Sequence, residues 1–472
     1  MKRLAAAVAL SLSLGPREAI ARGELPTRLA VPGMGTVTLY APPASPEEVV
    51  LFVSGDGGWN LGVVPMAERL RGLGALVAGI DIRPFLRDLD ASKGCAYPAG
   101  NLEELSRTIQ LRQRLPEYKR PILVGYSSGA TLVYAALAAA PPETFAGAIS
   151  LGFCPDLELA NPLCRQRGLG YAKRAKGVGF DLAPFAGLAV PWFVLQGEID
   201  QVCDPAATRR FASATGSSRL VSLPKVGHGF SVTPRWDARY VEAYRAIAAA
   251  RAAQDGPATG APASPGTGIG DLGLVEVKAS APERDTLAVI LTGDGGWAEI
   301  DKSLAAGLAA AGTPVVGWSS LRYYWTPRTP EAAALDLARI VAHYASAWGK
   351  QHVLLVGYSF GADVLPFLVN RLPPAERARV AGVSLLGLSD TAAFEFHVSS
   401  WLGAGGDPRH ATRPEVARLA EPVTCLYGEG EEDSACRGLR GARVRSVAVG
   451  TGHHFGGDYA RLTSLILDGA AR

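Results

Sequence analysis

The feature that most constrains this chain is an internal duplication. The segment VSGDGGW at 53–59 returns as LTGDGGW at 291–297, and ILVGYSSGA at 122–130 returns as LLVGYSFGA at 354–362. A third pair, GHGF at 227–230 and GHHF at 452–455, follows in the same order. Three matches in one order, at a slowly drifting spacing, indicate one domain copied twice, so the chain is expected to fold as two similar domains.

The length and a compositional break agree with two domains. A chain of 472 residues exceeds the usual size of a single domain. Residues 254–270 read QDGPATGAPASPGTGIG, a composition typical of a flexible linker. We therefore expect one domain over 27–250, a linker over 251–270 and a second domain over 271–472.

The N-terminus predicts export. A basic start at Met1–Arg3 precedes an apolar run at Leu4–Leu14, and small residues at Ala19 and Ala21 provide a cleavage signal. The run is too short to cross a bilayer, which takes about 20 apolar residues. We expect a signal peptide over 1–21, cleaved near Ala21, and a periplasmic mature protein. With a net charge of +3 and no basic block, nucleic acid is not an expected partner.

The six cysteines contain no CxxC pair, so the sequence predicts no metal site and no cofactor. An exported chain can form disulfides. Cys425–Cys436 and Cys154–Cys164 are the local candidate pairs, with buried free thiols as the alternative.

Each half alternates short apolar runs with Ala-rich amphipathic segments such as Pro330–Trp348. Buried strands alternating with helices predict a mostly parallel, doubly wound α/β sheet in each half. The expected strands of the two halves are Val49–Val53, Leu76–Ile82, Ile122–Val124, Trp192–Leu195, Ala288–Leu291, Pro314–Trp318, His352–Val356 and Val423–Tyr427.

A G-x-S-x-G motif follows an expected strand and precedes an expected helix in both halves. This is the context of the nucleophile elbow of the α/β-hydrolase fold, where the serine hydroxyl is exposed above the sheet. Ser359 is the main candidate nucleophile, and the backbone N–H of Phe360 is expected to donate to the oxyanion. Ser127 and Ser128 are the corresponding residues of the first half.

A serine hydroxyl needs a base, and the base needs an orienting acid. In this fold both follow the serine along the chain, which favours His453, because it aligns with His228, over its neighbour His454. The acid is expected after the strand at 423–427: Asp433 is our choice and Glu431 the alternative. In the first half, Asp200 is the candidate acid and Asp204 the alternative.

The Gly-rich segment after the first strong strand of each half is expected to supply the second oxyanion donor. The candidates are Asp294 and Gly295, with Asp56 and Gly57 in the first half. A phosphate-binding P-loop is excluded because no Lys-Ser/Thr follows. A carboxylate beside an oxyanion would oppose catalysis, so we expect Asp294 to bond the loop backbone or a cationic substrate group.

These blocks resemble those of the VirJ/AcvB group of bacterial virulence-associated proteins. The resemblance rests on the GDGGW segment at 293–297, the elbow at 357–367, Glu432 to Cys436 and the closing GHHFGGDY at 452–459. The first half is a looser copy. The resemblance implies a periplasmic α/β-hydrolase-like protein that hydrolyses aminoacyl-phosphatidylglycerol, lysyl or alanyl, and contacts the membrane peripherally.

Two further expectations follow. A non-catalytic periplasmic scaffold for virulence or secretion machinery, with protein partners, is the alternative function. Several aromatic residues are candidates for lipid contact, with burial in the core as the alternative reading; they are Trp318, Tyr323, Tyr324, Trp325 and Trp401.

Overall fold

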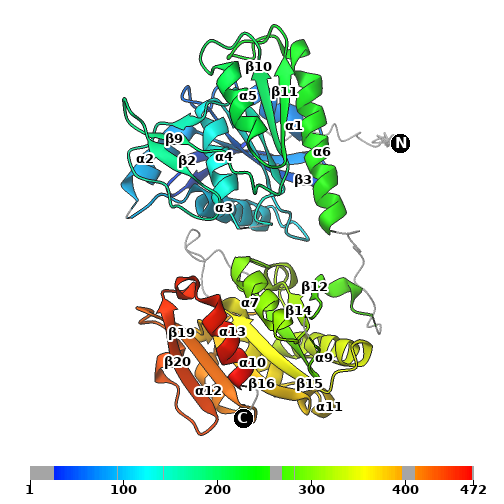
Figure 1. The fold of residues 1–472 in the computed structure, drawn as a ribbon. Helices are drawn as coiled ribbons and strands as arrows, with labels where there is room; N and C mark the ends of the chain where they lie inside the picture. The colour runs from blue at the N-terminus through cyan, green and yellow to red at the C-terminus, as the bar shows by residue number, and fades with distance from the viewer. Residues whose placement is uncertain are drawn as a thin grey trace, which may run out of the picture.

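The chain folds into two α/β domains, each built on its own central sheet (Figure 1). The computed structural model describes residues 26–92, 94–141, 143–255, 268–280, 282–395 and 410–469. The expected signal peptide and Trp401 lie outside these residues, as does most of the expected linker. No helix in the described ranges is both long and apolar enough to cross a membrane.

The first domain has an eight-stranded sheet in the order β1-β2-β4-β3-β5-β6-β10-β11. Neighbouring strands from β4 to β11 pair in parallel, whereas β1 and β2 run antiparallel to their neighbours. A small separate sheet holds β7 (Asp156–Leu157), β8 (Tyr171–Lys173) and β9 (Phe180–Leu182). The main strands are β1 (Thr27–Val31), β2 (Gly35–Tyr40), β3 (Glu48–Val53), β4 (Ala75–Ile80), β5 (Ile122–Tyr126), β6 (Gly147–Leu151), β10 (Trp192–Gly197) and β11 (Ser218–Leu223).

Helices cover both faces of this sheet because its strands are apolar on both sides. Along β3, Val49, Leu51 and Val53 face one hydrophobic core, and Val50 and Phe52 face the other. The first core is closed by α2 (Ile82–Ala91), α3 (Pro98–Arg112), α4 (Ser128–Ala139) and α5 (Pro205–Ser213), and the second by α1 (Val64–Arg71) and α6 (Asp237–Asp255).

The second domain repeats this plan with one edge strand fewer, in the order β12-β14-β13-β15-β16-β19-β20. Only β12 runs antiparallel to its neighbour in this sheet. The strands are β12 (Leu274–Val277), β13 (Thr286–Leu291), β14 (Val315–Trp318), β15 (His352–Tyr358), β16 (Val380–Leu386), β19 (Val423–Glu429) and β20 (Val444–Thr451).

The helices of the second domain also form two layers. One face packs on α7 (Glu299–Ala310) and α13 (Tyr459–Gly469), and the other on α9 (Pro330–Ala347), α10 (Phe360–Asn370) and α12 (Thr412–Ala417). Short elements complete the domain: α8 (Ser320–Tyr323), α11 (Pro374–Arg377), β17 (Thr391–Ala392) and β18 (His410–Ala411).

The mostly parallel α/β architecture expected from the sequence is confirmed in both domains. One strand boundary was wrong, because the apolar run to Ile82 leaves the sheet after Ile80. Asp81 caps α2 instead, its side chain accepting a hydrogen bond from the Arg83 N–H at 3.0 Å.

All six cysteines are paired. Cys425–Cys436 forms as expected, but Cys154–Cys164 does not. Instead Cys95 bonds Cys164, and Cys154 bonds Cys203, 49 residues along the chain. The free-thiol alternative is wrong too. Proximity in sequence failed as a guide because β6 and β10 are neighbours in the sheet, so the loops after them, which carry Cys154 and Cys203, lie side by side.

Candidate active sites

In the second domain Ser359 lies in the sharp turn between β15 and α10. Its backbone adopts φ 51° and ψ −118°, a strained conformation for a residue with a Cβ. Its Oγ lies 2.9 Å from Nε2 of His453, and Nδ1 of His453 lies 2.5 Å from Oε1 of Glu431. The three side chains therefore form a continuous nucleophile–base–acid chain.

The flanking glycines make this turn possible. A Cβ on Gly361 would lie 2.3 Å from the carbonyl oxygen of Leu291, and one on Gly357 would lie 2.5 Å from that of Gly361. Helix and strand thus approach at backbone contact, as the elbow motif predicts.

The structure places Glu431, not Asp433, beside the histidine, so our choice of acid was wrong and the alternative holds. The N–H of Glu431 donates to the carbonyl of Gly428 in a tight turn after β19, and Oε2 of Glu431 accepts from the Gly428 N–H at 2.7 Å. This turn directs the Glu431 side chain to His453. Asp433 lies two residues farther along and lines a neighbouring cavity.

His453 is held from two further sides. A Cβ on Gly387, which has φ +68°, would lie 2.7 Å from Cε1 of the His453 ring. The phenol of Tyr358 donates to the His453 carbonyl at 3.3 Å and contacts Nδ1 of His454 at 3.2 Å. His454 is therefore a neighbour of the elbow tyrosine rather than the base.

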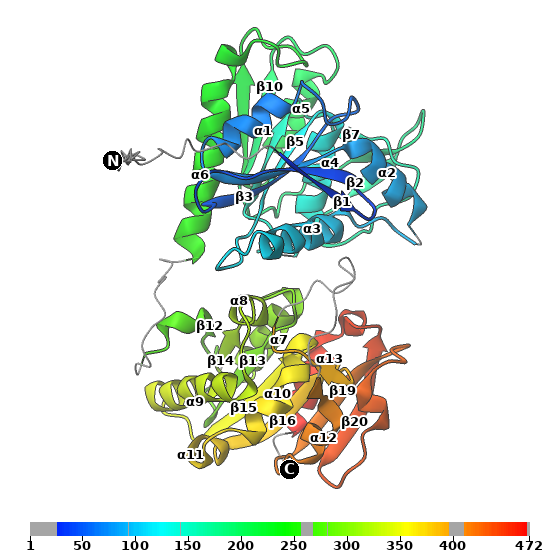
Figure 2. The ribbon, with the colours of Figure 1, turned by 180° about the vertical axis from the view of Figure 1, so that it is seen from behind.

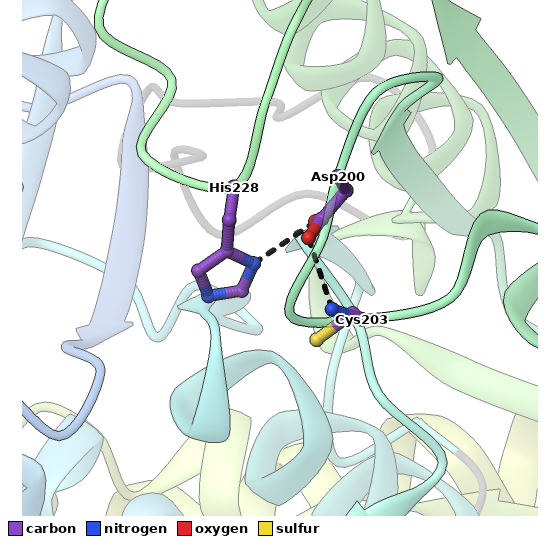
Figure 3. Close-up of side chains that lie close together, drawn as sticks. All are labelled: Asp200, Cys203 and His228. Carbon is purple, nitrogen blue, oxygen red and sulfur yellow. Dashed lines mark hydrogen bonds and ion pairs between the residues drawn. The ribbon is translucent and has the colours of Figure 1, made fainter.

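The first domain contains a second complete chain of the same kind. Ser127 has φ 54° and ψ −124°, and its Oγ lies 2.9 Å from Nε2 of His228. Nδ1 of His228 lies 2.9 Å from Oδ2 of Asp200, which lies between the imidazole and the backbone of Cys203 (Figure 3). Asp204, the alternative acid, instead caps α5 through the N–H groups of its first turn.

Asp200, Cys203 and His228 also offer donor atoms within 4.8 Å of one another, as a metal site would. The Cys203 sulfur, however, is bonded to Cys154 and is no thiolate ligand. The carboxylate already binds His228 and the N–H groups of Val202 and Cys203. This cluster is better described as an acid–histidine pair on a disulfide-anchored loop.

The Gly-rich loops lie next to the serines because a tryptophan anchors each. A Cβ on Gly79 would lie 2.0 Å from the ring of Trp59, and one on Gly317 would lie 2.2 Å from the ring of Trp297, so each indole packs directly against a strand glycine. A Cβ on Gly293 would lie 3.3 Å from Cβ of Ser359. The loop backbone thus reaches the candidate nucleophile, as expected for an oxyanion loop.

Both loop aspartates contact side chains, so the first expectation for Asp294, a bond to the loop backbone, is wrong, and the second, a cationic substrate group, stays a prediction. Asp56 accepts a hydrogen bond from Oγ of Ser128 at 2.6 Å. Asp294 lies 3.6 Å from the guanidinium of Arg107, a residue of the other domain. In this structure the partner of each carboxylate is a side chain rather than the loop backbone.

A cavity of about 520 Å³ opens beside His453. Three consecutive acidic residues line it, Glu431, Glu432 and Asp433, together with the loop 387–389 after β16. The four described aromatic residues that were candidates for lipid contact are at most 6% exposed, so the alternative reading of burial is correct; they are Trp318, Tyr323, Tyr324 and Trp325.

Sequence reasoning missed several residues that build these sites. The elbow tyrosine repeats in both motifs, and in the first domain Tyr126 likewise donates to the carbonyl of His228, at 3.0 Å. That repetition was the available signal. No local pattern marks Gly387 or Arg107, because only the fold brings them to the site.

Comparison with known families follows the same division into two halves. The family profile of the bacterial virulence protein VirJ matches residues 47–149 and 285–472. The chain belongs to the VirJ family. The second VirJ segment contains Ser359, Glu431 and His453, whereas the first contains Ser127 but ends before Asp200.

Three similar solved structures each align with about half of this chain and with nearly all of their own length. An esterase domain from Rhodothermus marinus is 17% identical over 45% of this chain and 92% of its own, with a TM-score of 0.31. Est1E from Butyrivibrio proteoclasticus is 12% identical over 48% and 99%, with a TM-score of 0.33. An alpha-beta serine hydrolase homologue from Coxiella burnetii is 16% identical over 49% and 99%, with a TM-score of 0.31. No protein with a curated description matches by sequence.

Proposed function

We propose that the protein is a serine ester hydrolase. The observation that carries this proposal is the chain from Ser359 through His453 to Glu431, on a serine held in a strained elbow conformation. A scaffold has no use for a half-buried hydroxyl beside an oriented imidazole, and here that arrangement occurs twice.

The geometry supports an acyl-enzyme mechanism. His453 takes the proton from Ser359 as Oγ attacks the ester carbonyl, and Glu431 stabilises the imidazolium that forms. The N–H of Phe360, at the first position of α10, has no intrahelical partner and is available to the oxyanion, together with an N–H of the loop at 293–295. His453 then protonates the departing alcohol, and water attacks the acyl-enzyme by the reverse sequence.

The proposed substrate is the aminoacyl ester of aminoacyl-phosphatidylglycerol, lysyl or alanyl. The acyl group of such an ester carries at least one ammonium group. The cavity beside His453, lined by Glu431, Glu432 and Asp433, has the charge to receive that ammonium. Membership of the VirJ family supports the same substrate, in line with the resemblance that the motifs show.

We further propose that the protein acts in the periplasm and contacts the membrane peripherally. Three disulfides that use all six cysteines support an oxidising compartment. The complete chain at Ser127 supports activity in the first domain as well.

Lipid analysis of a deletion strain tests the substrate. In a bacterium that synthesises aminoacyl-phosphatidylglycerol, deletion should raise the level of this lipid, and wild-type protein but not Ser359→Ala should restore it. An unchanged lipid profile would exclude this substrate and leave the hydrolase assignment to be judged on soluble esters. A phenotype preserved in the Ser127→Ala/Ser359→Ala double variant would favour the scaffold function.

A further inference from the structure

Each oxyanion loop carries an aspartate next to the place where negative charge develops. Asp56 follows Gly55, and Asp294 follows Gly293, the glycine packed against the nucleophile Ser359. An unpaired carboxylate there raises the energy of the oxyanion, so each domain needs a way to offset it.

In the first domain, a side chain of the same domain contacts the carboxylate of the oxyanion loop. The residue after its nucleophile is Ser128, and the hydroxyl of Ser128 donates to Oδ2 of Asp56 at 2.6 Å. This bond also ties the oxyanion loop to the first turn of α4, so charge and loop position are controlled together.

The second domain has no such donor, because the residue after its nucleophile is Phe360. Asp294 instead faces the guanidinium of Arg107, 3.6 Å away on α3 of the first domain. The Asp294 side chain is 58% exposed, whereas the Arg107 side chain is only 12% exposed. The guanidinium is therefore held by its surroundings, and the carboxylate is the more solvent-exposed partner of the pair.

Arg107 is fixed by its own domain. Glu103, one helical turn earlier on α3, forms an ion pair and hydrogen bond with it. The two carboxylates on either side of the guanidinium together keep the pKa of Arg107 above its usual value, although burial alone lowers it.

A second contact joins the segment that follows α3 to the second domain. The indole N–H of Trp325 donates to the carbonyl of Leu115 at 2.9 Å, and its ring lies 5.2 Å from that of Tyr118. These rings pack with Leu111 and Leu321 in a small apolar cluster that joins the domains. Figure 2 shows α3 facing the end of the second domain that carries α8.

We propose that Arg107 is a positioning residue for the second active site, so that the first domain completes the oxyanion loop of its neighbour in trans. The inference rests on the proposed hydrolase function of Ser359. The two copies would then do more than carry out two separate reactions. The hydroxyl of Ser128 contacts Asp56 within the first domain, and the guanidinium of Arg107 contacts Asp294 from the other domain.

The test uses the full chain with Ser127→Ala, so that all turnover comes from Ser359. With p-nitrophenyl butyrate, Arg107→Ala should lower kcat roughly 10- to 100-fold with little change in KM, because the charge matters most in the transition state. Arg107→Lys should keep part of the activity. The control is Lys302→Ala, which removes another ion pair between the domains, Lys302–Glu143 at 3.4 Å, and should leave kcat unchanged.

Two further measurements separate positioning from folding. In a chain with both serines, Arg107→Ala should slow labelling of Ser359 by a fluorophosphonate and leave labelling of Ser127 at its normal rate. In a double-mutant cycle, Arg107→Ala should have much less effect once Asp294→Asn has removed the charge. An equal loss of kcat with and without Asp294→Asn, or an unchanged kcat in Arg107→Ala, overturns the inference. No labelling of Ser359 in the wild type would instead refute the hydrolase function.

Discussion

Replacing Glu431 by Gln tests the assignment of the acid in the second active site. The variant keeps the size of the side chain but removes the charge that stabilises the imidazolium of His453. At a charge separation of about 4 Å, the attraction is about 4 kcal/mol at an effective dielectric of 20. Solvent screening reduces this to about 2–3 kcal/mol, because the His453 side chain is 43% exposed.

We therefore expect kcat to fall roughly 30- to 160-fold in Glu431→Gln. The assay is p-nitrophenyl butyrate hydrolysis in the Ser127→Ala background. Asp433→Asn is the matched control: it removes a neighbouring charge that lines the cavity, and should change kcat less than about threefold. If Asp433→Asn causes the large loss and Glu431→Gln does not, the assignment is refuted.

Two more predictions concern the second domain. Burial raises the pKa of Asp363 to about 7, so the free energy of unfolding of the wild type should fall as pH rises from about 4 to 8. Urea denaturation at a series of pH values should show that Asp363→Asn removes up to about 4 kcal/mol of that fall. Parallel pH dependences in the two proteins would contradict this prediction. Gly387→Ala should lower kcat at least about tenfold by displacing His453. Gly349 has a similar φ of +63° but open space around it, so Gly349→Ala should lower only the free energy of unfolding, by about 1 kcal/mol. Equal kcat values in the two variants would refute the steric argument.

The sequence predicted the architecture because the relevant signals are local. Apolar runs and G-x-S-x-G turns determine strand, elbow and helix within a few residues. Because the same motifs recur in the same order in both halves, the prediction for one half supports the prediction for the other. The alignment with His228 alone favours His453 over His454, and in the structure Nε2 of His453 lies 2.9 Å from Oγ of Ser359.

What the sequence did not predict depends on where loops lie in space. Glu431 and Asp433 are two residues apart, and the turn at Gly428 decides which one faces the histidine. The Cys154–Cys203 bond depends on the adjacency of β6 and β10. The contact between Arg107 and Asp294 joins two domains and leaves no pattern in either one.

The most direct test of the account is the number of reactive serines in the folded chain. Intact-mass analysis after treatment with a fluorophosphonate should show two adducts on the wild type, one on Ser359→Ala, one on Ser127→Ala and none on the double variant. A folded wild-type protein that takes up no adduct would contradict the central claim that these strained serines, each hydrogen-bonded to a histidine, are nucleophiles.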